Sequence, residues 1–226
     1  MLDMVSDYRQ IPIKPEHKEK TTFSCHRGHF QFNKMPFGLS NAPATYQRCI
    51  DMVLMGLKGI DCLVYLDDLI CFSATMEEHV KKLRNILEIL YQANFKIQAD
   101  KCVFATDTVE YIGHICTPRG IRSDPKKAKA IEEYPVPKRV KDFRSFIGLA
   151  GYYRRHVPNF AKLAQILTNL TNKEVPFVWT EEHQNAFKEV KRILGTEPLQ
   201  IYPDFSQPFI IACDSSTKAT GAILSQ

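Results

Sequence analysis

The spacing of apolar residues along the first half of the chain predicts helices that alternate with short strands. Apolar residues recur at helical spacing in SNAPATYQRCIDMVLMGL, and again after a capping box that begins at Thr75. Between these helices the pattern predicts strands over residues 62–66 and 69–72. A further strand follows the second helix. This order is most of a split β-α-β-β-α-β unit, whose first strand must come from the extreme N-terminus.

The same pattern predicts two tight turns and a more helical second half. TTFSCHRGHFQFNKMP predicts a hairpin with Gly28 in its turn, and KCVFATDTVEYIGHICT predicts strand character with a bend at Gly113. Asp124 followed by Pro125 marks a helix start, and Thr180 begins a later helix. Two strands begin within the last residues of the chain. The fold class expected is therefore α+β.

Composition excludes several classes of protein. The 226 residues are 44% hydrophobic and 24% charged, which is typical of a globular chain. No apolar run approaches the roughly 20 residues that cross a bilayer, so we expect no membrane partner. The N-terminus lacks the pattern of a signal peptide. The seven cysteines form no CxxC pair. We expect reduced thiols, no structural zinc and an intracellular protein, in a cytoplasmic particle or the nucleus, that is not secreted.

Positive charge is concentrated in one segment. The net charge is +5, and KRVKDFRSFIGLAGYYRRH, Lys138 to His156, holds six Lys or Arg residues, one acid and four aromatic residues. Phosphate neutralisation and base stacking would both use this mixture. An amphipathic helix with a solvated basic face explains the same pattern equally well.

Two adjacent carboxylates interrupt the most strand-like segment, VYLDDLICFS. Asp67 and Asp68 lie at the tip of the predicted hairpin, and Asp3 lies where the first strand should end. In a split β-α-β-β-α-β unit these three carboxylates converge. Like charges at so short a distance are unfavourable unless a cation compensates them or one carboxylate takes up a proton. A pair of Mg²⁺ ions, the usual arrangement for in-line phosphoryl transfer, would compensate them. A polar hairpin turn is the alternative explanation of the dipeptide.

The motifs, taken together, resemble one family. LDMVSDYRQIPI, KTTFSCHRGHFQFNKMPFGLSNAPATYQ, VYLDDLICFS, KCVFATDTVEYIGHICTPRGI, FRSFIGLAGYYRRHVPNF and FVWTEEHQNAFKEVKRIL follow one another in the chain. In this order they resemble the reverse transcriptases of Gypsy/Ty3-like long-terminal-repeat retrotransposons and related retroviral polymerases. The resemblance covers nearly the whole chain.

The resemblance implies roles for particular residues. Asp3, Asp67 and Asp68 match the catalytic aspartates that hold two Mg²⁺ ions. Tyr8 matches the aromatic residue that excludes a 2′-hydroxyl, although a core aromatic would explain it too. The resemblance places Phe37 and Gly38 beside the incoming nucleotide and Lys101 near the triphosphate, although a solvated lysine would explain Lys101 equally well. Asp214 matches the first metal ligand of a ribonuclease H site. The residues implied to contact primer and template are Tyr111, Gly113, His114, Arg144, Tyr152, Arg154 and Arg155.

The resemblance also implies a domain order. Residues 1–122 resemble the palm with part of the fingers, residues 123–156 the helical thumb, residues 157–205 the linker, and residues 206–226 the start of a ribonuclease H domain. After Asp214 the chain contains no Asp or Glu. We therefore expect this chain alone to lack ribonuclease H activity.

Two departures from the family pattern stand out. Asp7 occupies a position where the family usually has Gly, which adds a negative charge near Asp3. The chain also starts two residues before Asp3, so we expect most of the fingers to be missing and the end that carries Asp3 to be loosely held.

The leading hypothesis is a segment of an RNA-directed DNA polymerase within a Pol polyprotein. Its partners would be RNA or DNA template–primer, dNTPs and the rest of the polyprotein: protease, ribonuclease H and integrase. A catalytically dead remnant that at most binds nucleic acid is the second hypothesis. An unrelated binding protein is the third.

Overall fold

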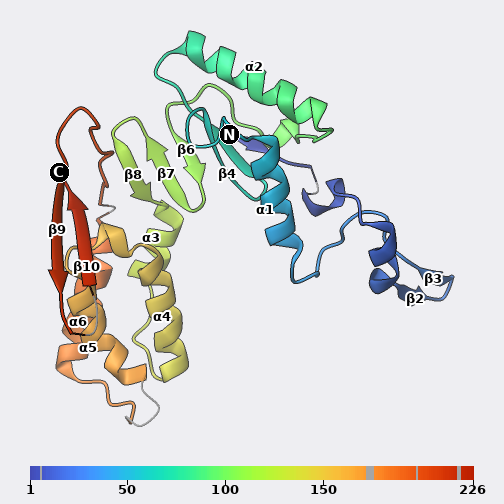
Figure 1. The fold of residues 1–226 in the computed structure, drawn as a ribbon. Helices are drawn as coiled ribbons and strands as arrows, with labels where there is room; N and C mark the ends of the chain where they lie inside the picture. The colour runs from blue at the N-terminus through green and yellow to red at the C-terminus, as the bar shows by residue number, and fades with distance from the viewer. Residues whose placement is uncertain (6, 172–175, 197, 218–219) are drawn as a thin grey trace. The chain divides into compact units, whose positions relative to one another are not determined.

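The chain folds as two compact units, Met1–Ile112 and Gly113–Gln226. The structure is a computed structural model, and it describes residues 1–5, 7–171, 176–196, 198–217 and 220–226 (Figure 1). Helices and strands occur in both units, as the predicted α+β class requires. Among the described residues, no helix is long and apolar enough to cross a membrane.

The first unit contains most of the predicted split unit. Its elements are β1 (Leu2–Asp3), η1 (Asp7–Gln10), η2 (Pro15–Thr21), β2 (Phe23–Cys25), β3 (Gly28–Phe30), α1 (Ala42–Val53), β4 (Cys62–Tyr65), β5 (Asp68–Cys71), α2 (Met76–Gln92), η3 (Ala99–Lys101) and β6 (Val109–Tyr111). Strands β1, β5 and β4 form an antiparallel sheet in that order. The strand expected from Lys101 onward begins only at β6, and the segment directly after α2 contributes instead a single bridge between Ile97 and Met4.

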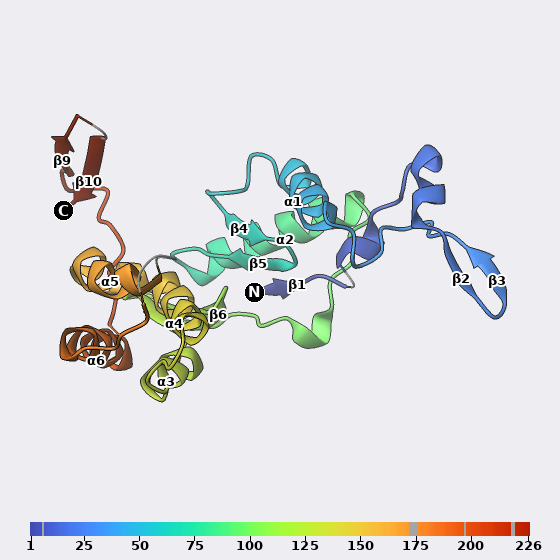
Figure 2. The ribbon, with the colours of Figure 1, turned by 90° about the horizontal axis from the view of Figure 1, so that it is seen from below.

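The core of this unit lies between the sheet and helices α1 and α2, which Figure 2 shows beside strands β4 and β5. Strand β5 alternates, with Leu69 and Cys71 buried and Asp68 and Ile70 half-exposed. A strand places successive side chains on opposite faces, so burial of Leu69 leaves Asp68 on the accessible face. The helices contribute the buried residues Tyr46, Ile50, Ile86 and Leu90.

Strand β1 is held on both of its sides. One side pairs with β5. On the other side the Val5 amide donates to the Lys96 carbonyl at 3.0 Å, and the Gln98 amide donates to the Asp3 carbonyl at 2.8 Å. The amide of Val103 donates to the carbonyl of Met1 at 3.0 Å. We expected a loosely held end; these backbone hydrogen bonds fix it instead.

Two local predictions from the sequence hold in the first unit. The Thr75 hydroxyl accepts a hydrogen bond from the Glu78 amide and so caps α2. Strands β2 and β3 form the predicted hairpin, but the turn consists of His26 and Arg27, and Gly28, at φ +125°, is the first residue of β3 and pairs with Cys25. Figure 1 shows this hairpin extending away from the sheet of its unit.

The second unit is mainly helical. Its elements are β7 (His114–Thr117), β8 (Gly120–Ser123), α3 (Pro125–Glu132), α4 (Val140–Tyr152), η4 (Arg154–His156), α5 (Phe160–Thr168), η5 (Asn169–Thr171), α6 (Glu181–Gly195), β9 (Ile210–Ser215) and β10 (Thr220–Ser225). Helices α3 to α6 share one core, with Phe143, Phe146 and Phe187 fully buried. The basic segment predicted as one helix is α4 followed by the 3-10 turn η4.

Gly120 allows the segment before β9 to pair with β8. The amide of Ile121 and the amide of Gln200 each donate to the other residue's carbonyl at 2.8 Å. A Cβ atom on Gly120 would lie 2.3 Å from the Gln200 carbonyl oxygen, and the residue has φ +145°. Only glycine meets both requirements.

Candidate active site

Asp3 and Asp68 are direct neighbours across two strands. In the antiparallel pairing of β1 with β5, Asp3 lies opposite Asp68 and Leu2 lies opposite Leu69. Both leucines are buried, so both carboxylates emerge on the same, accessible face. The convergence that the sequence predicted for these two residues is present.

Asp67 lies in the two-residue turn between β4 and β5. Leu66, the other turn residue, has φ +53°, the left-handed region that non-glycine residues seldom occupy. The turn therefore delivers Asp67 and Asp68 in succession, at the edge of the site where Asp3 lies. All three aspartates are half-exposed.

Lys101 lies next to Asp3. Its Nζ is 4.0 Å from Asp3 Oδ1, and its side chain is 57% exposed. It is held there because η3 follows Gln98, whose amide bonds to the Asp3 carbonyl. An exposed ion pair of this length contributes little to stability, but it places a cation beside the carboxylates.

The carboxylates do not form a closed metal cage. Within the described part of the chain, no group of three or more His, Cys, Asp or Glu side chains is close enough to hold a metal ion. The donor set nevertheless suits Mg²⁺, which prefers carboxylate oxygens and keeps several positions for water and phosphate. The assignment of these aspartates as metal ligands therefore stays a prediction.

Tyr8 and Phe37 lie together, as a shared role at the nucleotide would require. Their ring centroids are 5.3 Å apart. The guanidinium of Arg9 lies 5.5 Å from the centroid of the Phe37 ring. Tyr8 also contacts Tyr46 of α1, so its ring is anchored to the core on one side. Gly38 has φ +94° and open space where a side chain would be.

Asp7 begins the 3-10 helix η1. Its side chain lies outside the described residues, and its effect on the charge near Asp3 stays a prediction.

Gly113, His114 and Tyr152 form a second group in the other unit. The Tyr153 hydroxyl donates to the Gly113 carbonyl at 2.7 Å, and the His114 ring stacks on the Tyr152 ring with centroids 5.3 Å apart. Burial, together with the nearby His156, holds the pKa of His114 below its usual value. The lowered pKa favours the neutral form of the His114 ring. Tyr111 ends β6 and is half-buried.

The predicted basic residues are exposed. Arg154 and Arg155 belong to η4, and Arg155 borders a groove of about 1030 Å³ together with Lys162 and Arg192. Arg144 differs, because its guanidinium donates to the Thr171 carbonyl at 3.0 Å and so ties α4 to η5. Its predicted contact with nucleic acid stays untested.

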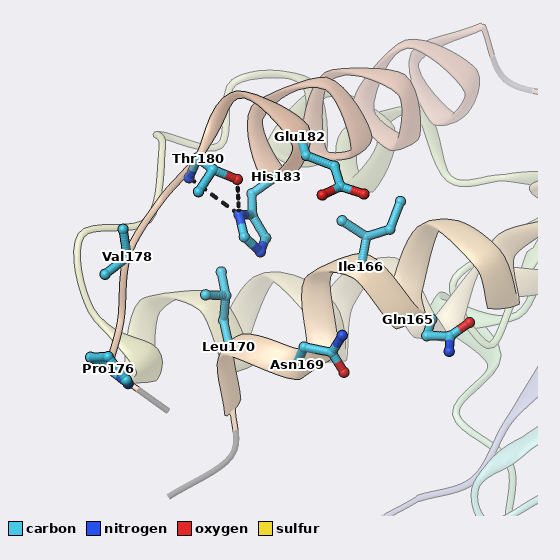
Figure 3. A pocket seen from close by; sticks show the side chains of 9 residues that line it. All are labelled: Gln165, Ile166, Asn169, Leu170, Pro176, Val178, Thr180, Glu182 and His183. Carbon is cyan, nitrogen blue, oxygen red and sulfur yellow. Dashed lines mark hydrogen bonds between the residues drawn. The ribbon is translucent and has the colours of Figure 1, made fainter. Parts of the chain in front are cut away.

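A separate hollow of about 600 Å³ lies between α5, η5 and the start of α6 (Figure 3). Figure 3 shows His183 facing into it, with Nδ1 bonded to the backbone amide and the hydroxyl of Thr180. This histidine forms the capping box of α6. The residues described around the hollow include no predicted site residue, so we assign it no catalytic role.

Asp214 lies in β9, opposite Gly221 of β10. Every residue of both strands is exposed. The structure places no second carboxylate opposite Asp214, in contrast to Asp68.

Two residues at the first site escaped the sequence reasoning. Arg9 follows Tyr8 and lies over Phe37. Gln47 lies on α1 and accepts a hydrogen bond from the amide of Leu66, the residue before Asp67. The only signal for Gln47 was a polar residue beside the apolar face of a predicted helix.

Comparison with known families decides the family. The family described as "Reverse transcriptase (RNA-dependent DNA polymerase)" matches residues 1–116, about half of the chain. The chain belongs to the reverse transcriptase family. A second description, "RNase H-like domain found in reverse transcriptase", matches residues 179–226 of this reverse transcriptase segment. The boundary predicted between linker and ribonuclease H stays a prediction.

Curated relatives place this reverse transcriptase segment among retrotransposons. It is 41% identical over 226 residues to the "Retrovirus-related Pol polyprotein from transposon 297" of Drosophila melanogaster. It is 40% identical over 237 aligned positions to the corresponding polyprotein from transposon gypsy of the same species. Both alignments include the whole chain, which spans only 21% of the length of the transposon 297 polyprotein and 23% of the length of the gypsy polyprotein. The resemblance to Gypsy-type elements is confirmed.

The fold agrees with solved reverse transcriptase structures. The "foamy viral protease-reverse transcriptase dRH in complex with ds DNA" matches 99% of this chain and 39% of its own chain, with a TM-score of 0.84 and 24% sequence identity. At that identity the likeness establishes the fold alone.

Proposed function

We propose that this reverse transcriptase segment carries the polymerase active site of a Pol polyprotein. Asp3, Asp67 and Asp68 bind two Mg²⁺ ions for template-directed transfer of nucleotides from dNTPs to a primer 3′-end. The observation that carries the proposal is the register of β1 with β5, which sets Asp3 opposite Asp68 and next to the turn that holds Asp67. The like charges of Asp3 and Asp68, on directly opposite residues, are unfavourable unless a cation compensates them or one carboxylate takes up a proton.

The bound metals would polarise the phosphate and lower the pKa of the primer hydroxyl. The aspartates supply the oxygen ligands on the accessible face of the sheet, and the buried face of the same strands keeps them in place. Lys101, whose Nζ lies 4.0 Å from Asp3 Oδ1, would donate a proton to the pyrophosphate leaving group.

The nucleotide would lie against the aromatic pair. Tyr8 packs beneath the sugar and excludes a 2′-hydroxyl, Phe37 contacts the base pair, and Gly38 lets the backbone approach it. The tilted contact of Tyr8 with Phe37 and its edge contact with Tyr46 support this assignment, because a selective contact needs a ring that cannot move aside.

Template and primer would contact residues of the second unit and Tyr111 of the first. Tyr111, Gly113 and His114 contact the primer end, and the exposed cations and aromatics of the 123–156 segment bind the duplex. Exposure of Arg154, Arg155 and Tyr152 supports this role. Within the polyprotein, Asp214 would be the first metal ligand of the ribonuclease H site. The particle or nucleus of the host cell is the expected location.

Primer extension by the Pol polyprotein that contains this segment tests the proposal. Asp67→Asn removes one metal-binding charge and should lower the rate of extension by more than about 100-fold. The affinity for template–primer should stay within about twofold, because the phosphate contacts lie elsewhere.

Asp107→Asn is the matched control, since Asp107 is an exposed aspartate in a loop of the same unit. Its extension rate should equal that of the unaltered protein. Near-normal extension by Asp67→Asn would remove this aspartate from the proposed site.

A further inference from the structure

The turn that presents Asp67 adopts an unfavourable backbone conformation. Leu66 has φ +53°, where a Cβ atom crowds the neighbouring carbonyl. Such a conformation persists only when the surrounding structure holds it. The turn is only two residues long, so a change at Leu66 changes the direction of the Asp67 side chain as well.

One side chain on α1 hydrogen-bonds to two backbone groups that lead into this conformation. The Leu66 amide donates to Gln47 Oε1 at 2.8 Å, and Gln47 Nε2 donates to the Val64 carbonyl at 3.4 Å. Gln47 is half-buried on a helix whose neighbouring residues, Tyr46 and Ile50, are fully buried. The helix is thus rigidly placed, and the tether transmits that rigidity to the turn.

A second set of contacts fixes the orientation of the Gln47 amide. Nε2 also donates to Asp51 Oδ1 at 2.9 Å, and Lys58 Nζ bonds to the same oxygen at 2.6 Å. Although burial works in the opposite direction, the hydrogen bonds from Lys58 and Gln47 keep the pKa of Asp51 below its usual value. The carboxylate is therefore a permanent acceptor. A flipped amide would direct Oε1 at two acceptors and Nε2 at the Leu66 donor.

We propose that Gln47 is a positioning residue for the β4–β5 turn. It holds Leu66 in the left-handed conformation and thereby fixes Asp67 and Asp68 in the directions that metal binding requires. The first part rests on the tether alone; the second part also rests on the proposed function of these aspartates.

Amide hydrogen exchange at Leu66, measured by NMR on the 226-residue chain, tests the tether without any metal. Gln47→Leu keeps the size of the side chain but removes the acceptor, so exchange at Leu66 should become about tenfold faster. Gln47→Glu combined with Asp51→Asn keeps an acceptor for the Leu66 amide and gives the second carboxylate oxygen an amide donor at position 51, so exchange should stay within about threefold of the unaltered chain. Arg48→Ala, on the exposed side of the same helix, is the control and should change nothing.

Exchange at Leu66 that is the same in Gln47→Leu and in the unaltered chain would overturn the tether. Gln47→Leu must keep the circular dichroism spectrum of the unaltered chain. If it unfolds, the double variant Gln47→Glu with Asp51→Asn decides: the tether predicts a protected Leu66 amide, and a fully exchanging amide in that folded variant would contradict it.

Mn²⁺ titration of the same chain tests the positioning role. Gln47→Leu should weaken binding by about tenfold. Glycine adopts positive φ without strain, so in the Leu66→Gly background the same change should weaken binding by less than about threefold. An equal loss in both backgrounds would mean that Gln47 acts only through general packing.

The two readouts separate this inference from the proposed function. If the unaltered chain binds no Mn²⁺, the assignment of the aspartates fails, while the exchange rate at Leu66 still decides the tether. If Asp67→Asn weakens Mn²⁺ binding and Gln47→Leu does not, the metal site stands and the positioning role is wrong.

Discussion

Among the described residues, two hairpins carry an aspartate on a strand, but only one of them sets that aspartate opposite a second carboxylate. In β4–β5 the residues alternate between buried and accessible, and the buried ones pack against α1 and α2. In β9–β10 all twelve strand residues are exposed. Both hairpins have the local pattern of a strand pair. The difference shows that local pattern makes a hairpin, whereas cover by helices fixes the direction of its polar side chains.

The neighbours of the two aspartates differ accordingly. Asp68 lies opposite a second carboxylate, Asp3, while Asp214 lies opposite Gly221. Negative charge is therefore concentrated at the first hairpin and dispersed at the second. This concentration of negative charge favours the binding of a divalent cation. The buried leucines on the opposite face of the strands keep the carboxylates in place.

The largest expected effect is on stability. Leu69 is fully buried behind Asp68, whereas Leu224 of β10 is 62% exposed. Leu69→Ala should lower the free energy of unfolding by about 2–5 kcal/mol through lost burial and a cavity. Leu224→Ala is the matched control and should change it by less than about 0.5 kcal/mol. Urea unfolding of both variants measures the difference.

Similar losses for the two leucines would mean that β9–β10 is covered in solution, and the contrast between the hairpins would disappear.

Thiol labelling sharpens the same contrast with a smaller effect. Burial, with smaller contributions from Cys71 and Asp61, raises the pKa of Cys62 in β4 to about 11. At pH 8 about one molecule in a thousand is then a thiolate, the form that reacts. Cys213 in β9 is exposed. Labelling of Cys62 with iodoacetamide should be at least about 100-fold slower than that of Cys213, and it should accelerate up to about pH 11.

Mass spectrometry of timed samples gives both rates. Equal rates at pH 8 would show that the β4–β5 hairpin opens readily.

The smallest expected effect concerns exposed residues whose proposed role does not require packing against helices. Arg154 and Arg155 are exposed cations, so they can bind phosphate without a buried support. Neutralising both should reduce the slope of log affinity against log salt by roughly one to two units, for every duplex sequence alike. Fluorescence anisotropy with labelled template–primer measures the slope. An unchanged slope would mean that Arg154 and Arg155 are solvated and do not contact phosphate.

Much of the fold could be predicted from the sequence because its signals are local. The apolar spacing of α1 and α2, the Thr75 cap and the hairpin at Gly28 each depend on residues close in the chain. The meeting of Asp3 with Asp68 followed from topology, since the split unit admits few strand orders.

The remaining features depend on contacts between distant residues, which no local pattern encodes. Gln47 is 19 positions from Leu66, and Gln200 approaches Gly120 from the far end of the unit. The backbone bonds that hold β1 come from the segment after α2. Arg144 was assigned to primer and template through the family resemblance, and no local pattern indicates its bond to the Thr171 carbonyl.

A calorimetric Mn²⁺ titration of the 226-residue chain and two asparagine variants tests most directly whether the covered hairpin is the metal site. Asp68→Asn removes the carboxylate opposite Asp3 and should weaken binding by more than about tenfold. Asp214→Asn should leave the affinity within about twofold, because that carboxylate has no partner strand residue of like charge. Equal affinities in the two variants, or a larger loss in Asp214→Asn, would contradict the assignment of the metal site to Asp3, Asp67 and Asp68.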